Sequence, residues 1–150
     1  DAITSASRKL YINELVHLIA DWVDKENNKK WQPGDYLLAL NYIPQVDVEV
    51  AVEAIASEQE RYKSLYPNLV DLINRAGYQY LRLKNVPSAL EVFRLNISLF
   101  PDFWNVYDSY GEALLENGDR DSAIRNFQKA LELNPDSKSA QDMLKKLDKE

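Results

Sequence analysis

The sequence holds one histidine, which makes His17 the first place to look for catalysis. Asp21 lies one helical turn later, so in a helix the two side chains would share one face, as a general base and its orienting carboxylate do. A hydrolase also needs a nucleophile beside the histidine, and Ser5 and Ser7 lie a few helical turns away. We therefore interpret His17 as an ordinary histidine beside a core stripe and expect no catalytic residues.

The composition also argues against metal and cofactor chemistry. The 150 residues include no cysteine, which excludes a thiol nucleophile, a disulfide and a cysteine zinc site, and a single histidine is a poor basis for a transition-metal site. The four glycines are isolated, so there is no glycine-rich phosphate loop. We expect no cofactor and no metal.

Charge and hydrophobicity narrow the classes of partner. A net charge of −6 would repel phosphate backbones, so we expect no nucleic acid. No apolar run reaches the roughly 18 residues of a membrane-spanning helix, so we expect no membrane span. The carboxylates are mixed with Lys and Arg at helical spacing, which is typical of solvated helix faces rather than of an acid–base pair.

An internal repeat with a period of about 34 residues organises the second half of the chain. Glycine inside a helix costs about 1 kcal/mol relative to alanine, so its recurrence there indicates close helix–helix approach. Pro67 lies one further period before Pro101. The residues that recur in register are Gly77 and Gly111, Leu81 and Leu115, Ser88 and Ser122, Ala89 and Ala123, Phe93 and Phe127, Leu99 and Leu133, and Pro101-Asp102 and Pro135-Asp136.

Each copy of the repeat predicts two helices, and a last helix follows them. The expected ranges are 69–84 and 87–99, then 103–117 and 120–133, then a cap with one polar face at 137–149. Gly118 is expected to close a helix in a left-handed conformation.

The first copy departs from the second at a few positions. Lys84 stands in the place of Gly118, so we expect Asn85 to take the left-handed angles. Pro87 suits a first helical position. Asn96 replaces the small Ala130, which predicts looser packing. Asn96-Ile97-Ser98 matches the glycosylation sequon, but its place in a packed helix argues against modification.

Residues 1–66 do not follow the repeat. Helices are expected at about 4–28, at 35–42 after a turn at Pro33-Gly34 and ending at Pro44, and at 48–65, with a short strand from Val46 to Val52 as the alternative. We expect the helix at 48–65 to act as the second helix of a degenerate repeat. The first of these helices carries its apolar residues on one side, namely Tyr11, Leu15, Leu18, Ile19 and Trp22.

The repeated residues resemble the tetratricopeptide repeat family. The resemblance covers roughly 70–150 and implies an all-α fold, a right-handed array of antiparallel helix pairs forming an α-α superhelix. It divides the chain into a helical N-terminal extension at 1–66, interpreted as including a degenerate repeat, and 67–150 with repeats at about 70–103 and 104–137 and a capping helix. The matching residues are Gly111, Ala123, Phe127, Ala130 and Pro135, and one repeat earlier Gly77, Tyr80, Ala89, Phe93 and Pro101.

A narrower resemblance concerns the strings Ala-Leu-Glu-Val-Phe-Arg-Leu-Asn at 89–96 and Asn-Val-Tyr-Asp-Ser-Tyr-Gly-Glu-Ala at 105–113. They are similar to repeats appended to bacterial serine hydrolases, which are beta-lactamase-like enzymes and esterases. The chain begins with Asp1 rather than Met, which predicts a cut piece or a processed product. The sequence does not choose between bacterial cytoplasm and periplasm.

Two functions follow from these resemblances. The first is a non-catalytic protein–protein interaction scaffold, an accessory module of a larger bacterial protein. The alternative is a regulatory or dimerising C-terminal tail of a serine hydrolase whose catalytic domain is absent from this chain. Partners would be a protein or peptide, the chain's own upstream domain, or a second copy in a homo-dimer through the N-terminal helices.

In such arrays the first helices of the repeats line a concave surface. Asp108, Glu112 and Glu116 would repel a peptide carboxylate, which argues against a chaperone-type carboxylate clamp and favours a basic or neutral segment. Trp104 and Tyr107 would add aromatic contacts if packing leaves them exposed. The predicted binding face consists of Asp71, Asn74, Tyr78, Arg82, Asn105, Asp108, Glu112 and Glu116.

Overall fold

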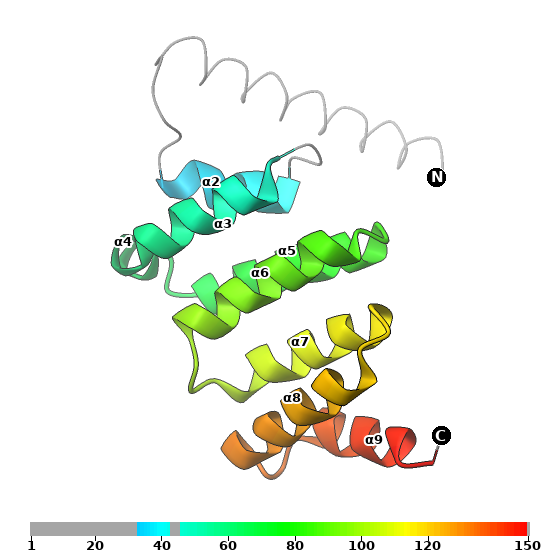
Figure 1. Ribbon diagram of the computed structural model, residues 1–150. Coiled ribbons are helices and arrows are strands. Elements are labelled where there is room, and N and C mark those ends of the chain that lie inside the picture. The colour runs from blue at the N-terminus through cyan, green and yellow to red at the C-terminus, as the bar shows by residue number, and fades with distance from the viewer. Residues whose placement is uncertain (1–32, 43–45, 150) are drawn as a thin grey trace, which may run out of the picture.

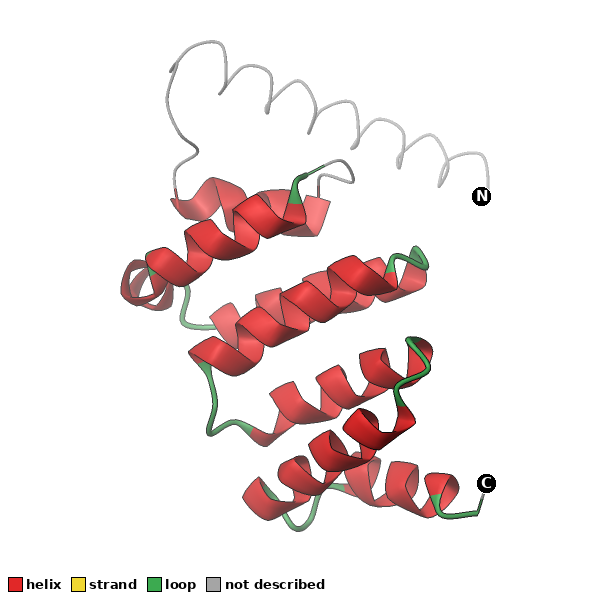
Figure 2. Ribbon diagram, in the orientation of Figure 1, coloured by secondary structure: helices red, strands yellow, loops and turns green. Residues whose placement is uncertain are grey.

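The computed structural model describes residues 33–42 and 46–149, and within these ranges every regular element is a helix (Figure 2). Each described helix is too short or too polar to cross a bilayer. The helices are α2 (Pro33–Tyr42), α3 (Val48–Ser57), α4 (Gln59–Leu65), α5 (Leu69–Arg82), α6 (Val86–Leu99), α7 (Trp104–Glu116), α8 (Arg120–Leu133) and α9 (Lys138–Leu147).

The helices form antiparallel pairs that stack in chain order (Figure 1). The pairs are α2 with α3, α5 with α6 and α7 with α8, while α9 packs on α8 at the C-terminal end and the short α4 lies beside α3. This architecture confirms the expected all-α array of helix pairs.

A glycine faces a phenylalanine ring inside each of the two later pairs. A Cβ atom on Gly77 would lie 2.5 Å from Phe93 Cε1, and one on Gly111 would lie 2.8 Å from Phe127 Cε1. Both rings are fully buried, as are Ala89 and Ala123 on the same helices. The two copies therefore have equivalent surroundings at these residues, and the close helix approach expected from the repeated glycines is confirmed.

The second helix of every pair begins with the same side-chain cap. Oδ1 of Asp47, Asn85 and Asp119 accepts a hydrogen bond from a backbone N–H in the first turn of the helix, at 3.2, 3.3 and 3.1 Å. Such caps satisfy backbone donors that the first helical turn leaves free. The caps of α3 and α6, at positions 47 and 85, are farther apart than one repeat period. A search at that period therefore misses the likeness of α3 to the later helices.

Polar contacts tie successive layers together. Arg75 of α5 donates from Nε to Asn41 Oδ1 at 3.1 Å and from a terminal nitrogen to the Tyr42 hydroxyl at 2.8 Å. Arg94 of α6 donates to the Tyr110 hydroxyl of α7 at 2.8 Å. Between α8 and α9, the Arg120 guanidinium donates to the Leu147 carbonyl. Each layer is thus fixed by apolar packing and by a cation at its edge.

The helices of the repeat lie close to their expected ranges, and three details are corrected. Residues 48–65 form two helices instead of one, because the backbone breaks at Glu58, with φ −116° and ψ 30°. The preference for helix over strand there is confirmed. Pro33 and Gly34 begin α2 instead of forming a turn, and Pro87 is the second residue of α6, after Val86. The expected helix at 4–28 lies outside the described residues.

Asn96 and Lys84 also differ from expectation. Asn96 is fully buried, and its Nδ2 donates to the Val70 carbonyl of α5 at 2.9 Å, so its exposure gives no sign of looser packing. This burial agrees with the argument against glycosylation. Lys84 itself takes the left-handed conformation, with φ 60°, while Asn85 caps α6 with φ −94°. The side chain of Asn85 therefore caps α6, and Lys84 takes the left-handed position after α5.

Replacement of Gly77 by alanine is expected to lower the free energy of unfolding by about 1–3 kcal/mol, the usual cost of overpacking a core. The added Cβ meets the Phe93 ring, which outweighs the helix propensity that alanine gains. Urea unfolding followed by circular dichroism measures the change. Phe93→Leu in the same chain should recover part of the Gly77→Ala loss, and strictly additive losses would contradict the contact.

Lys84→Gly is expected to raise the free energy of unfolding by about 0.5–1 kcal/mol. An L-residue in the left-handed region costs about 1–2 kcal/mol, and glycine returns part of this gain as unfolded-state entropy. Lys84→Ala keeps the Cβ and removes the charge, so it is the control for the side chain. Equal stabilisation by both variants in thermal unfolding would show that charge, not backbone strain, is responsible.

Candidate functional site

A groove with a volume of about 700 Å³ runs between the first helices of the later layers. Four of the eight residues predicted for the concave face line it, namely Tyr78 and Arg82 of α5 and Glu112 and Glu116 of α7. Its other lining residues are Leu81, Lys84, Leu115, Met143 and Lys146, the last two from α9. The structure therefore brings residues from three helices to one hollow.

The other four predicted residues do not line the groove. Asp71 is exposed, while Asn74 and Asn105 are half-buried. Asp108 departs from the expectation that packing leaves it free, since only 4% of it is exposed. Its Oδ1 atom and the Oδ1 atom of Asn74 are both buried without a hydrogen-bond partner. Asp108 thus lies below the surface, one helical turn before Glu112.

The two aromatic side chains that the sequence predicted as added contacts on the binding face are partly covered. Trp104 and Tyr107 are half-buried, and the Tyr107 hydroxyl donates to the Pro101 carbonyl at 2.8 Å. The nearby Phe103 is 40% exposed instead. The exposed aromatic at this end of α7 is therefore the residue before the helix.

Tyr78 joins α5 to α7 at the centre of the groove. Its ring packs edge-on against Phe93, with centroids 5.3 Å apart, and its hydroxyl is hydrogen-bonded to Ser109 Oγ at 3.3 Å. Burial raises the pKa of Tyr78, the Ser109 hydroxyl lowers it in part, and the charge of Glu112 raises it. The phenol is therefore a neutral hydrogen-bonding group at physiological pH.

Burial also acts on two of the three carboxylates of α7, Asp108 and Glu112. It raises the pKa of Asp108, an effect that the Ser139 hydroxyl of α9 partly offsets. It raises the pKa of Glu112, where the Tyr78 hydroxyl lowers the value in part and the charge of Asp108 raises it. Desolvated carboxylates interact more strongly with an approaching cation than exposed ones do.

The groove carries both signs of charge. Glu112 and Glu116 lie on α7, while Arg82, Lys84 and Lys146 come from α5, the turn after it and α9. The sequence prediction did not include Lys84, Met143 or Lys146. Lys146 lies one repeat period after Glu112, so extending the repeat register into the last helix would have identified it.

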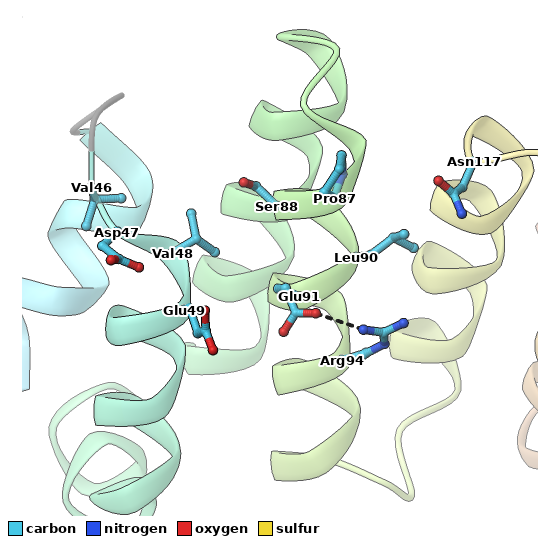
Figure 3. A pocket seen from close by; sticks show the side chains of 10 residues that line it. All are labelled: Val46, Asp47, Val48, Glu49, Pro87, Ser88, Leu90, Glu91, Arg94 and Asn117. Atoms are coloured by element: carbon cyan, nitrogen blue, oxygen red, sulfur yellow. Dashed lines mark hydrogen bonds and ion pairs between the residues drawn. The ribbon is translucent and has the colours of Figure 1, made fainter.

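A second hollow, of about 460 Å³, lies along the second helices of the pairs (Figure 3). The cation in its lining, Arg94, is already paired with Glu91 at 2.8 Å and bound to Tyr110. Asp47 Oδ1 is used as the cap of α3. Residues lining this hollow are Val46, Asp47, Val48, Glu49, Pro87, Ser88, Leu90, Glu91, Arg94 and Asn117. Because part of its polar lining already serves the fold, the groove at Tyr78 is the better candidate.

Metal-ligating side chains are not clustered in the described ranges. No group of three or more His, Asp or Glu side chains is placed to hold a metal ion there. His17, Asp21, Ser5 and Ser7 lie outside the described residues.

Asp108→Asn is expected to raise the free energy of unfolding at pH 7, because it removes a buried charge and keeps the shape. A raised folded-state pKa means that the carboxyl favours folding below its unfolded pKa of about 4 and loses this contribution as the pH rises through the folded value. The gain from the substitution should therefore be small near pH 4 and grow toward pH 7. Urea unfolding at several pH values measures it.

Asp142→Asn is the control for this pH series. Asp142 lies one repeat period after Asp108, on α9, and is exposed. Its substitution should change stability little at any pH. A gain for Asp108→Asn that is the same at pH 4 and pH 7 would contradict the electrostatic explanation.

Known proteins resemble this chain in both sequence and fold. Residues 104–137 match the family model described as Tetratricopeptide repeat. A search of curated proteins found no match. The solved structure described as "First TPR of Spaghetti (RPAP3) bound to HSP90 peptide SRMEEVD" is 21% identical with a TM-score of 0.52, covering 77% of this chain and 92% of that one.

A second solved structure, "Crystal structure of MamA protein", is 23% identical with a TM-score of 0.42, covering 87% of this chain and 76% of that one. The family match covers the α7–α8 pair and the turn after it, with Gly111 and Phe127 inside it. Residues 104–137 are thus similar in sequence to a tetratricopeptide repeat, and the described helix array is similar in fold to a solved tetratricopeptide repeat structure.

Proposed function

We propose that this chain is a protein–protein interaction scaffold that holds a segment of its partner in the groove between α5, α7 and α9. The observation that carries the proposal is the groove itself, lined by an aromatic phenol, two carboxylates and three cations on a tetratricopeptide-type array. Rigid stacked helices present such a surface at little cost in ordering on binding. The similar solved structure carries a bound HSP90 peptide.

We further infer that the chain has two functional parts. Residues 1–66 act as an N-terminal extension, in which α2 and α3 form a degenerate repeat. Residues 67–150 comprise repeats at about 70–103 and 104–137, followed by the cap α9. The binding face extends from the groove to the predicted residues Asp71, Asn74 and Asn105, while Asp108 lies below it.

The partner segment in this proposal is basic or neutral. The desolvated carboxylates of Asp108 and Glu112 lie along α7 and would repel an acidic segment, as would Glu116. Arg82, Lys84 and Lys146 line the same groove from α5, the turn after it and α9. A segment that places a cation beside α7 would meet the least repulsion.

A finer proposal concerns the larger protein in which the scaffold works. The strings at 89–96 and 105–113 support an accessory module of a bacterial protein, with the tail of a serine hydrolase as the alternative. The coding sequence upstream of Asp1 separates the two. A Ser-x-x-Lys or Gly-x-Ser-x-Gly motif there favours the hydrolase, and an upstream region without either motif removes it.

Two labelled peptides of equal length test the charge preference. We expect SRMKKVK with an amidated C-terminus to bind about threefold to tenfold more tightly than SRMEEVD with a free C-terminus, and the difference to shrink as salt is added. Fluorescence anisotropy measures both dissociation constants. Tighter binding of SRMEEVD would reverse the proposed preference.

A charge-matched pair of variants locates the effect. Glu112→Gln with Glu116→Gln should remove most of the preference for the basic peptide. Asp121→Asn with Glu132→Gln changes the net charge equally at exposed positions of α8, away from the groove residues, and should leave the preference in place. The same loss in both variants would point to the overall charge of the protein instead of the groove.

A further inference from the structure

The two ends of the array differ in how they meet solvent. At the C-terminal end, the exposed residues of α9 are polar, namely Lys138, Ser139, Asp142, Lys145 and Lys146. At the other end, the first pair exposes large apolar side chains, with Leu38 of α2 at 51%, Tyr42 of α2 at 44% and Val50 of α3 at 50%. The first described pair therefore exposes large apolar side chains among its polar residues, whereas a helix that ends a repeat array exposes a polar face, as α9 does.

This apolar exposure is concentrated at the first pair. The other large apolar residues exposed in the described ranges, Leu65, Leu83 and Phe103, each come from a different segment. Single exposed apolar residues are normal on a protein surface, whereas several on one terminal pair of helices indicate a covered face. Tyr42 is partly engaged, because its hydroxyl and ring both contact Arg75. The side chains of Leu38 and Val50 are hydrocarbon, so hydrogen bonding cannot explain their position.

We propose that the chain's own N-terminal segment, residues 4–28, covers the apolar surface of α2 and α3 and completes the array. The segment repeats apolar residues at helical spacing, with Leu15, Leu18 and Trp22 among them, so it offers one apolar side. Only residues 29–32 separate it from the start of α2 at Pro33. This short connection gives the segment a high effective concentration at the first pair.

Charge supports the same occupant. Asp47, Glu49 and Glu53 are exposed on α3 and the residue before it, around Val50. The connection between this segment and α2 carries Lys29 and Lys30 and no carboxylate. Opposite charges beside the apolar contact favour this arrangement over an unrelated acidic partner. The surface is distinct from the groove, so this inference does not depend on the proposed function.

The absence of cysteine allows a direct test in the full-length chain. Single variants Leu38→Cys and Val50→Cys report on the first pair, and Leu83→Cys is the control, since Leu83 is 65% exposed after α5. Each thiol is reacted with a chromogenic aromatic disulfide, and circular dichroism checks that the variant is folded. We expect at least one of the two first-pair thiols to react about tenfold or more slowly than Cys at 83.

A second set of variants identifies what protects the thiol. Adding Leu15→Asp and Leu18→Asp should restore fast reaction at 38 or 50 without changing the rate at 83. Protection by the chain's own segment should be independent of protein concentration. Equally fast reaction at 38, 50 and 83 would overturn the proposal, as would protection that the Asp substitutions leave intact. Protection that rises with concentration, together with dimer formation in sedimentation, would assign the surface to a second copy of the chain.

Discussion

The contact between a helical glycine and a phenylalanine of the following helix sets the geometry of the two later pairs. In both, the ring occupies the space that a Cβ atom would need. The first helix is therefore held against the second at a distance that only glycine permits. The small buried side chains of Ala89 and Ala123 on the second helix allow the same close approach. The two pairs are alike because they share this contact.

The same contact positions the groove. Tyr78 follows Gly77 and Glu112 follows Gly111, and both line the hollow between the first helices. Because each glycine fixes the rotation of its helix, the next residue projects at a defined place in every layer. The Tyr78 ring is held further by its edge contact with Phe93, the ring that packs on Gly77. In each pair, the glycine that packs inside is thus followed directly by a residue that lines the groove.

Sequence reasoning recovers the parts of this molecule that local rules decide. The helix α8 begins and ends where expected, because Asp119 caps it and Asn134-Pro135 stops it. Four of the eight residues predicted for the binding face line the groove. The burial of Asp108 could not be predicted in this way, because its surroundings include residues of another layer, such as Ser139 of α9. The remaining differences have local causes that compete with one another. Asn85 suits both a left-handed position and a helix cap, and in the structure it takes the cap and leaves the left-handed angles to Lys84. Where two uses of a residue are both favourable, the tertiary contacts decide, and a single sequence does not show them.

The break at Glu58 interrupts a run of good helix formers, so propensity alone would continue the helix. From Asp47 to Asn85 the chain is longer than from Asn85 to Asp119, and the bend between α3 and α4 lies within this longer stretch. The helix α4 packs on the core, since Tyr62 is fully buried and Lys63 Nζ lies 5.6 Å from the centroid of the Phe100 ring. In a stacked array each layer contacts only its neighbours, so a change of length in the first pair need not alter the later ones. That locality explains how a divergent first pair can coexist with two layers that share the glycine–phenylalanine contact. It is also consistent with α3, which keeps the cap at Asp47 and the buried Ala51 although the repeat period is lost.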